Sequence, residues 1–169
     1  MNTAGRSQIF VAIRSLVVAS GFVLLWVWLS LWVRRFDQGL GIPIPPWLRP
    51  VGGVLALAGA LLALSCIVTF ATKGRGTPAP FDPPREFVAA GPYRFVRNPM
   101  YVGGIALIFG AGLALASPSI MLLAAFAFAA SHLFVVFYEE PALTRRFGES
   151  YLQYKKSVSR WLIRRRRSS

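Results

Sequence analysis

The sequence is poor in the residues that give soluble proteins their charge and their cross-links. Only 6 of 169 residues are Asp or Glu, against 19 Lys and Arg, and only 15% are charged in total. The single cysteine, Cys66, cannot form an internal disulfide, and with one histidine the chain offers no Cys and His cluster at metal-ligand spacing. These shortages argue against an ordinary soluble enzyme and a disulfide-stapled secreted domain, and we expect no metal.

Long apolar runs are what the chain has instead. Hydrophobic residues make up 55% of it, and its mean hydropathy is +0.53. A run of about 20 residues crosses a hydrocarbon core of ~30 Å as a helix. Four runs qualify, at residues 15–33, 51–72, 101–116 and 120–138. We therefore predict an all-α membrane protein with about four transmembrane helices; the first run is too long for a cleaved signal peptide.

Small residues repeat at helical spacing in the second and third runs. They are Gly52, Ala56 and Ala60, with Gly59 and Ala63 in parallel, and Gly103, Ala106, Gly110 and Ala114. Such faces let membrane helices approach each other closely. The third and fourth runs are separated only by a turn around Pro118, so we expect them to form a helical hairpin.

After the fourth run the apolar period changes. Leu143, Phe147, Tyr151, Tyr154 and Val158 recur every three or four residues, with polar residues mostly between them. This spacing predicts a C-terminal amphipathic helix lying along the membrane surface, weakened at Gly148 and followed by the arginine cluster 164–167. Tyr151 and Tyr154 are either its buried face or a lid over a bound ligand.

Positive charge lies between the apolar runs, which favours a membrane surface over nucleic acid. Five Lys and Arg fall in the 73–99 loop and nine after the fourth run. This bias places both segments in the cytoplasm, and an even number of spans places the N-terminus there too. We expect a multi-pass protein of a bacterial inner membrane, with membrane lipids as partners and no nucleic acid.

Two polar patches next to the apolar runs are candidates for chemistry, because ionisable groups near hydrocarbon are costly. One covers residues 91–101, where Asn98 precedes Pro99, and the other residues 138–141. A hairpin with arms of similar length brings them to one membrane face. Glu139 and Glu140 point about 100° apart on a helix, so they face different partners; the alternative is that both are solvated at the interface.

These residues also resemble a known family. Gly91-Pro92-Tyr93, Arg97-Asn98-Pro99-Met100-Tyr101-Val102-Gly103, Glu139-Glu140 and Phe147-Gly148-x-x-Tyr151-x-x-Tyr154 occur in the order of the isoprenylcysteine carboxyl methyltransferase family. Asn-Pro-Met-Tyr and Tyr-Glu-Glu-Pro are also similar to phosphatidylethanolamine N-methyltransferases. The resemblance covers residues 80–163 and implies S-adenosylmethionine as methyl donor, without a metal, in a cytoplasmic pocket.

The resemblance implies roles for individual residues. A carboxylate of Glu139 or Glu140 would meet the ammonium of the donor and Arg97 its carboxylate, while Tyr93 or Tyr101 would flank the adenine or the sulfonium. Asn98, Pro99 and Gly104 complete the expected donor site; Asn98 stands where many members of the carboxyl-methylating branch have His. Glu140 and Arg97 are the expected catalytic residues, with Glu140 or Glu139 as base for an amine acceptor. His132 is either a packing residue or, with Tyr151 and Tyr154, part of the acceptor pocket.

We therefore divide the chain into a two-span region, residues 1–72, and a methyltransferase core, residues 73–169. The leading hypothesis is methylation of a lipophilic acceptor, as by isoprenylcysteine carboxyl methyltransferases. Alternatives are N-methylation of a phospholipid amine, methylation of a small thiol or lipid, and, in another class, a non-catalytic membrane scaffold or lipid-binding protein.

Overall fold

The computed structural model describes residue 17 and residues 20–73 and 89–162 of the chain. In these ranges the backbone is helical apart from short connections and one isolated bridge between Val96 and Ser159. The predicted all-α class is confirmed. The arginine cluster 164–167, most of the 73–99 loop and the start of the first apolar run lie outside the described residues.

The elements follow one another with few residues between them. Residues 20–33 are helical and lead into η1 (Arg34–Phe36), α2 (Asp37–Leu40), α3 (Leu48–Lys73), η2 (Gly91–Arg94), α4 (Pro99–Ala114), α5 (Pro118–Phe134), the π-helical turn η3 (Val135–Glu139), α6 (Glu140–Phe147) and α7 (Glu149–Ser157).

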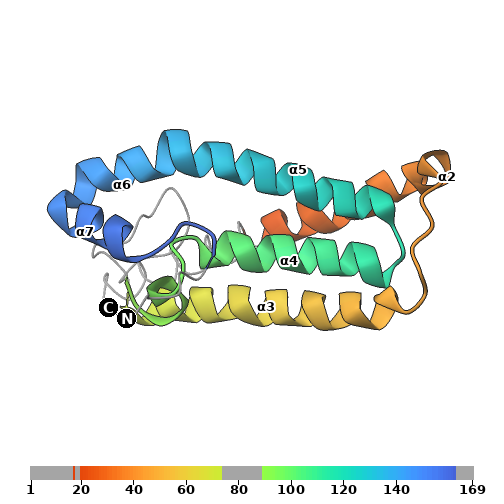
Figure 1. Ribbon diagram of the computed structural model, residues 1–169, viewed down its shortest axis with the longest axis horizontal. Helices are drawn as coiled ribbons and strands as arrows, with labels where there is room; N and C mark the ends of the chain where they lie inside the picture. The colour runs from red at the N-terminus through yellow and green to blue at the C-terminus, as the bar shows by residue number, and fades with distance from the viewer. Residues whose placement is uncertain (1–16, 18–19, 74–88, 163–169) are drawn as a thin grey trace, which may run out of the picture.

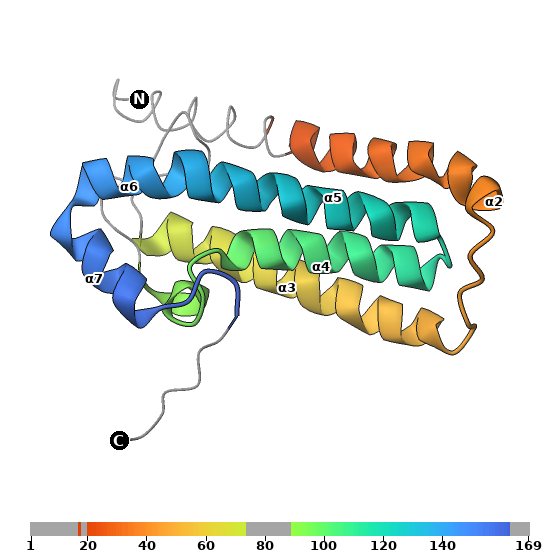
Figure 2. The same cartoon turned by 45° about the horizontal axis from the view of Figure 1, so that its top comes forward.

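The helix α4 packs between α3 and α5 (Figures 1 and 2). Its contact with α3 is made by the predicted small residues. A Cβ added at Gly59 would lie 2.5 Å from the Leu107 backbone nitrogen, and one at Gly110 would lie 2.4 Å from that of Ala56. The two backbones therefore touch where side chains would separate them, which confirms the small-residue faces. Cys66 is fully buried in α3.

The hairpin between α4 and α5 is closed by local chemistry. Ala116 has a φ of 49°, a left-handed conformation that reverses the chain. Ser117 then caps α5, its hydroxyl accepting a bond from the Ile120 nitrogen at 3.4 Å, and Pro118 takes the first helical position, where no amide hydrogen is needed. The predicted helical hairpin is confirmed.

Two helices of the described chain are long and apolar enough to cross a membrane: Leu48–Thr69 and Pro118–Phe147. The second is a single run through α5, η3 and α6, longer than the predicted 120–138. The third predicted span, α4, is a shorter apolar helix of 16 residues. The first predicted span is helical where it is described, over residues 20–33.

The C-terminal amphipathic segment is two helices instead of one. Gly148 has φ 55° and ψ −129°, a conformation that favours glycine, and it separates α6 from α7. Tyr151 and Tyr154 are buried, whereas Arg145, Arg146 and Lys156 are exposed, so the predicted polar and apolar faces are present. The break turns α7 back toward the start of α4 (Figure 1).

Candidate active site

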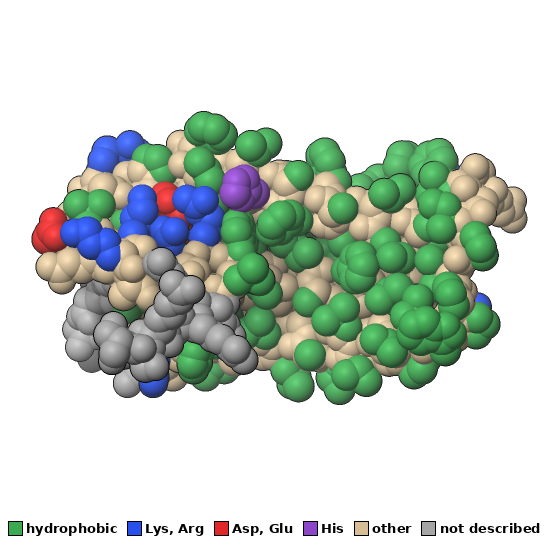
Figure 3. All heavy atoms as spheres, in the orientation of Figure 1, with side chains coloured by type: hydrophobic (Ala, Val, Ile, Leu, Met, Phe, Trp, Pro, Cys, Tyr) green, Lys and Arg blue, Asp and Glu red, His purple; other side chains and the backbone are tan. Residues whose placement is uncertain are grey.

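Charged residues gather at one end of the bundle. There the start of α4, the end of η3, α6, α7 and the segment after α7 meet, and Figure 3 shows Lys, Arg and acidic side chains grouped beside a surface that is otherwise mostly hydrophobic. This convergence is what the hairpin geometry predicted for the two polar patches.

Glu140 is at the centre of this polar cluster. The residue is only 5% exposed. Arg160 binds its carboxylate with two hydrogen bonds, from Nε to Oε1 at 2.7 Å and from Nη2 to Oε2 at 3.0 Å. Arg97 Nη1 lies 2.9 Å from Oε1 and Lys155 Nζ 3.3 Å from Oε2. Three cations therefore surround one carboxylate, and the bond to Glu140 raises the pKa of Arg160.

Arg97 is held by its backbone as well as by its charge. Its amide donates to the Ser159 carbonyl at 2.8 Å, and its side chain is only 10% exposed. Nη1 is close to Glu140, but neither Nη1 nor Nε makes a hydrogen bond of good geometry to any described residue. Buried guanidinium N–H groups that lack a well-aligned acceptor are costly, so this side of Arg97 suits an anionic ligand.

Glu139 faces a different partner. The hydroxyl of Tyr101 in α4 donates to Glu139 Oε2 at 3.0 Å. The π-helical turn η3 ends at Glu139, and α6 begins at Glu140. The sequence expectation that the adjacent acids face different partners therefore holds: Glu139 meets α4, while Glu140 meets Arg97 and the residues that follow α7. π-Helical turns are frequent at functional sites.

Three tyrosines pack next to the cluster. The Tyr154 hydroxyl donates to the Tyr93 carbonyl at 2.6 Å, tying α7 to η2. Burial and then the negative charge of Glu140 raise the pKa of Tyr151 to about 12, while Arg97 opposes that shift. Burial also raises the pKa of Tyr93 and of Tyr154. All three phenols are therefore neutral at physiological pH.

His132 belongs to an aromatic group beside the acids. Its Nδ1 accepts a hydrogen bond from Trp161 Nε1 at 3.0 Å, and the Trp161 ring also contacts Phe128 and Tyr101 edge-on. The tertiary hydrogen bond matches the packing interpretation of His132. The contact between Trp161 and Tyr101 links this group to Glu139.

The remaining expected residues lie at the start of α4. Asn98 is buried, and its Nδ2 donates to the Arg160 carbonyl at 3.2 Å; Pro99 is buried at the first position of the helix. Gly103 packs against the α3 backbone, and a Cβ added there would lie 2.8 Å from the Gly59 carbonyl oxygen. A Cβ added at Gly104 would have no neighbouring described atom within 4 Å. Of the two glycines, only Gly104 leaves open space.

Sequence reasoning missed Lys155, Arg160 and Trp161. The first two were counted only as charges after the last span, because nothing in a basic tail distinguishes a cation that pairs with a buried acid from one in water. Arg160 follows the end of α7 by three residues, after the chain has become extended at Val158. Among the described residues no group of three His, Cys, Asp or Glu side chains is placed to hold a metal ion.

A model of the family described as phospholipid methyltransferase matches residues 47–150. The match includes Arg97, Glu139 and Glu140 but ends before Lys155 and Arg160. Comparison with curated proteins finds no match.

The fold also resembles that of a solved structure, the eukaryotic intramembrane Ras methyltransferase ICMT (isoprenylcysteine carboxyl methyltransferase). The TM-score is 0.54 at 22% sequence identity, over 95% of this chain and 53% of that one. The chain thus spans about half the length of that protein.

Proposed function

This chain belongs to the phospholipid methyltransferase family, and on that premise we propose that it transfers a methyl group from S-adenosylmethionine to a lipophilic acceptor in the membrane. The observation that carries the proposal is that the hairpin brings Arg97, whose Nε and Nη1 make no well-aligned hydrogen bond, to Glu140, while the adjacent Glu139 bonds Tyr101. A donor with an amino-acid end needs both charges at one place.

The carboxylate of the donor suits Arg97. Its Nε and Nη1 make no hydrogen bond of good geometry within the described residues, although Nη1 lies 2.9 Å from Glu140 Oε1, and the neighbouring cations favour a negative charge. A carboxylate accepting from a guanidinium is among the stronger hydrogen-bonded pairs in proteins. Glu140 then acts chiefly as a positioning residue that fixes Arg97.

The ammonium of the donor suits Glu139 better than Glu140. Both oxygens of Glu140 are already engaged by Arg160, Arg97 and Lys155. Glu139 accepts a hydrogen bond from Tyr101 on Oε2. A carboxylate has room for several donors, so Glu139 can hold an ammonium while Tyr101 orients it.

S-adenosylmethionine supplies an electrophilic methyl group on a sulfonium. The chain's own residues then have to align the acceptor and exclude water. Trp161, Phe128 and Tyr101 form an apolar wall beside Glu139. For an amine acceptor, Glu139 is also placed to take a proton.

The acceptor should reach the site sideways from the bilayer. The open space at Gly104 and the aromatic group around Trp161 lie at the start of α4, where the polar cluster adjoins the apolar surface (Figure 3). We assign this end of the bundle to the cytoplasmic side, in line with the basic residues gathered there, and place His132 in the wall of the acceptor site.

Donor binding is the direct test. Isothermal titration of the protein in nanodiscs with S-adenosylhomocysteine should show one site. Arg97→Ala and Glu139→Gln should each weaken binding tenfold or more, since each removes a charged hydrogen bond of about 1.5–3 kcal/mol. Tyr138→Phe, at an exposed neighbouring residue, is the matched control. A folded protein that does not bind would favour the scaffold hypothesis.

The acceptor class needs a separate experiment. Incubation with donor labelled on the methyl group and a total lipid extract, followed by mass spectrometry, shows where the label goes. A base-labile label indicates a carboxyl ester, and label in an amine headgroup indicates N-methylation. Glu139→Gln should reduce N-methylation more than ester formation, because only an amine requires loss of a proton.

A further inference from the structure

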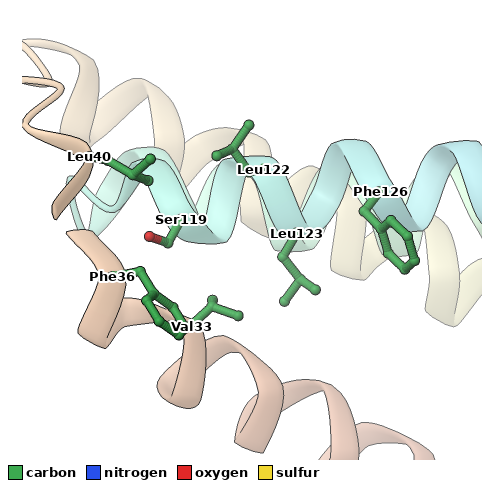
Figure 4. A pocket seen from close by; sticks show the side chains of 7 residues that line it. All are labelled: Val33, Phe36, Leu40, Ser119, Leu122, Leu123 and Phe126. Carbon is green, nitrogen blue, oxygen red and sulfur yellow. The ribbon is translucent and has the colours of Figure 1, made fainter.

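An apolar crevice lies at the other end of the bundle from the polar cluster. Its volume is about 440 Å³. One wall is the chain around η1 and α2, with Val33, Phe36 and Leu40, and the other is the start of α5, with Leu122, Leu123 and Phe126 (Figure 4). These residues are apart from every residue assigned above to methyl transfer.

The crevice is graded from a polar outer end to an apolar inner end. Ser119, in the first turn of α5, is at the outer end, and Phe126 lies about 10 Å deeper at 1.5 Å per residue. On the opposite wall, Leu40 lies near Ser119 and Val33 lies further in (Figure 4). Arg34 and Arg35 are exposed in η1, next to the outer end. This is the polarity of a lipid molecule entering from the membrane surface.

Ser119 provides a second, independent observation. It lines the crevice and is 5% exposed, yet its Oγ makes no hydrogen bond of good geometry within the described part of the chain. Its backbone nitrogen is satisfied separately, by Asp37 Oδ1 at 2.9 Å. The hydroxyl is close enough to the Asp37 carboxylate to help lower the pKa of Asp37. Because it makes no bond of good geometry there, it can donate instead to an acceptor oxygen in the crevice.

Two arginines give the outer end of the crevice a preference for negatively charged headgroups. Arg34 is close enough to lower the pKa of Asp37, whose carboxylate bonds Ser119, and Arg35 is held over the Trp32 ring at 3.9 Å. Each arginine near a membrane surface contributes about 1 kcal/mol toward anionic headgroups. The outer end therefore combines a hydroxyl donor with two cations and one carboxylate, that of Asp37, which leaves an excess of one positive charge.

We propose that this crevice binds one acyl chain of an anionic phospholipid, in the leaflet opposite the polar cluster. The chain packs between Phe36 and Leu123, an ester oxygen accepts from Ser119 Oγ, and the phosphate lies near Arg34 and Arg35. Because α3 is 26 residues long, about 39 Å, the two ends of the bundle reach opposite surfaces of a bilayer. The lipid is thus a bound component and not the methyl acceptor.

Native mass spectrometry of the delipidated full chain tests this. Titration with phosphatidylglycerol should show one lipid bound at least tenfold more tightly than phosphatidylcholine, as expected from two arginines. Leu123→Trp, which fills the crevice, should weaken phosphatidylglycerol binding at least tenfold. Leu57→Trp, at an exposed position of α3, is the matched control and should leave it unchanged.

Further variants separate the two parts of the site. Arg34→Gln with Arg35→Gln should remove the preference between the two lipids, and Ser119→Ala should weaken both; these surface and small changes remain informative if Leu123→Trp does not fold. Glycerol phosphate, which has the charge without the chain, should not compete. Equal binding of the two lipids, no effect of Leu123→Trp, or a dimer that Leu123→Trp dissociates would each overturn the proposal.

Discussion

The helix α4 has two contacts of opposite character. Against α3 it presents backbone and small residues, so that a Cβ at Gly59, Gly103 or Gly110 would meet backbone atoms at 2.9 Å or less. At its N-terminal end Tyr101 bonds Glu139 of η3, and Arg97 and Asn98, just before the helix, contact Glu140 and Arg160 through ions and hydrogen bonds. The first contact fixes where α4 lies, and the second depends on that placement.

The difference teaches how a small membrane protein can hold a charged site. At Gly59, Gly103 and Gly110 the contact between α3 and α4 is backbone against backbone, so it sets the position of α4 closely. The ionic contact consists of long side chains that adapt, and part of Arg97 is left unsatisfied. Substitutions in the α3–α4 contact should therefore destabilise the fold. Substitutions in the ionic contact should reduce both stability and ligand binding.

The largest effect is expected at Glu140. Glu140→Ala leaves Arg97 buried without its counter-charge, and removing one partner of a buried ion pair costs about 3–5 kcal/mol. Thermal unfolding in detergent should show a large fall in melting temperature. Glu149→Ala, which removes an exposed acid at the start of α7, is the control and should change stability by less than about 0.5 kcal/mol. Equal effects of the two would mean that the cluster contributes only surface charge.

Gly59→Ala should be the next most damaging change. The added methyl would lie 2.5 Å from the Leu107 nitrogen and 2.6 Å from the Gly103 carbonyl oxygen, and backbone cannot move aside as a side chain can. Overpacking of this kind costs about 1–3 kcal/mol. Gly53→Ala in the same helix is the control, since no described atom lies within 4 Å there, and it should be neutral or slightly stabilising. The comparison fails if both variants unfold alike.

These two contacts also differ in how far the sequence foretold them. The α3–α4 contact follows from local composition, because glycine and alanine at every fourth position have few other uses in a membrane helix. The hairpin could likewise be predicted from the turn around Pro118. That Arg97 and Tyr101 lie opposite Glu139 and Glu140 followed from the hairpin by geometry, but which side chain contacts which acid did not.

What the sequence did not foretell depends on small changes of helical path. The π-helical turn before Glu140 shifts the phase of the helix, and no characteristic residue pattern marks such a turn in a sequence. The break at Gly148 was read as a weak point within one helix, and only tertiary contacts decide that it ends α6. Arg160 and Trp161 reach the polar cluster because of that break. Without it, the sequence indicated only residues of a basic tail.

Tyr101→Phe probes the ionic end without disturbing the fold. It removes the 3.0 Å bond to Glu139 and keeps the ring against Trp161. If Glu139 holds the donor's ammonium, S-adenosylhomocysteine should bind about tenfold more weakly, since one hydrogen bond to a charged group is worth about 1.5 kcal/mol or more. The melting temperature should fall only slightly. Unchanged affinity with normal folding would remove Tyr101 and its orientation of Glu139 from the donor site.

The smallest effect is expected far from both contacts, where Asp37 ties α2 to the start of α5. Burial opposes ionisation there, but hydrogen bonds from Ser117 and Ser119 and the charge of Arg34 outweigh it and lower the pKa of Asp37. Asp37→Asn should cost about 0.5–1 kcal/mol, as for a side chain at a helix N-terminus.

The pH dependence of that small effect identifies its origin. A carboxyl group whose pKa is lower in the folded state stabilises the fold above its unfolded pKa of about 3.9, and loses that contribution as the pH falls through the folded value. The gap in melting temperature between the natural chain and Asp37→Asn should therefore be constant from pH 8 to about pH 5 and close below pH 4. A gap that persists at pH 3 would mean that Asn packs badly at this position, and that the charge of Asp37 does not hold the two segments together.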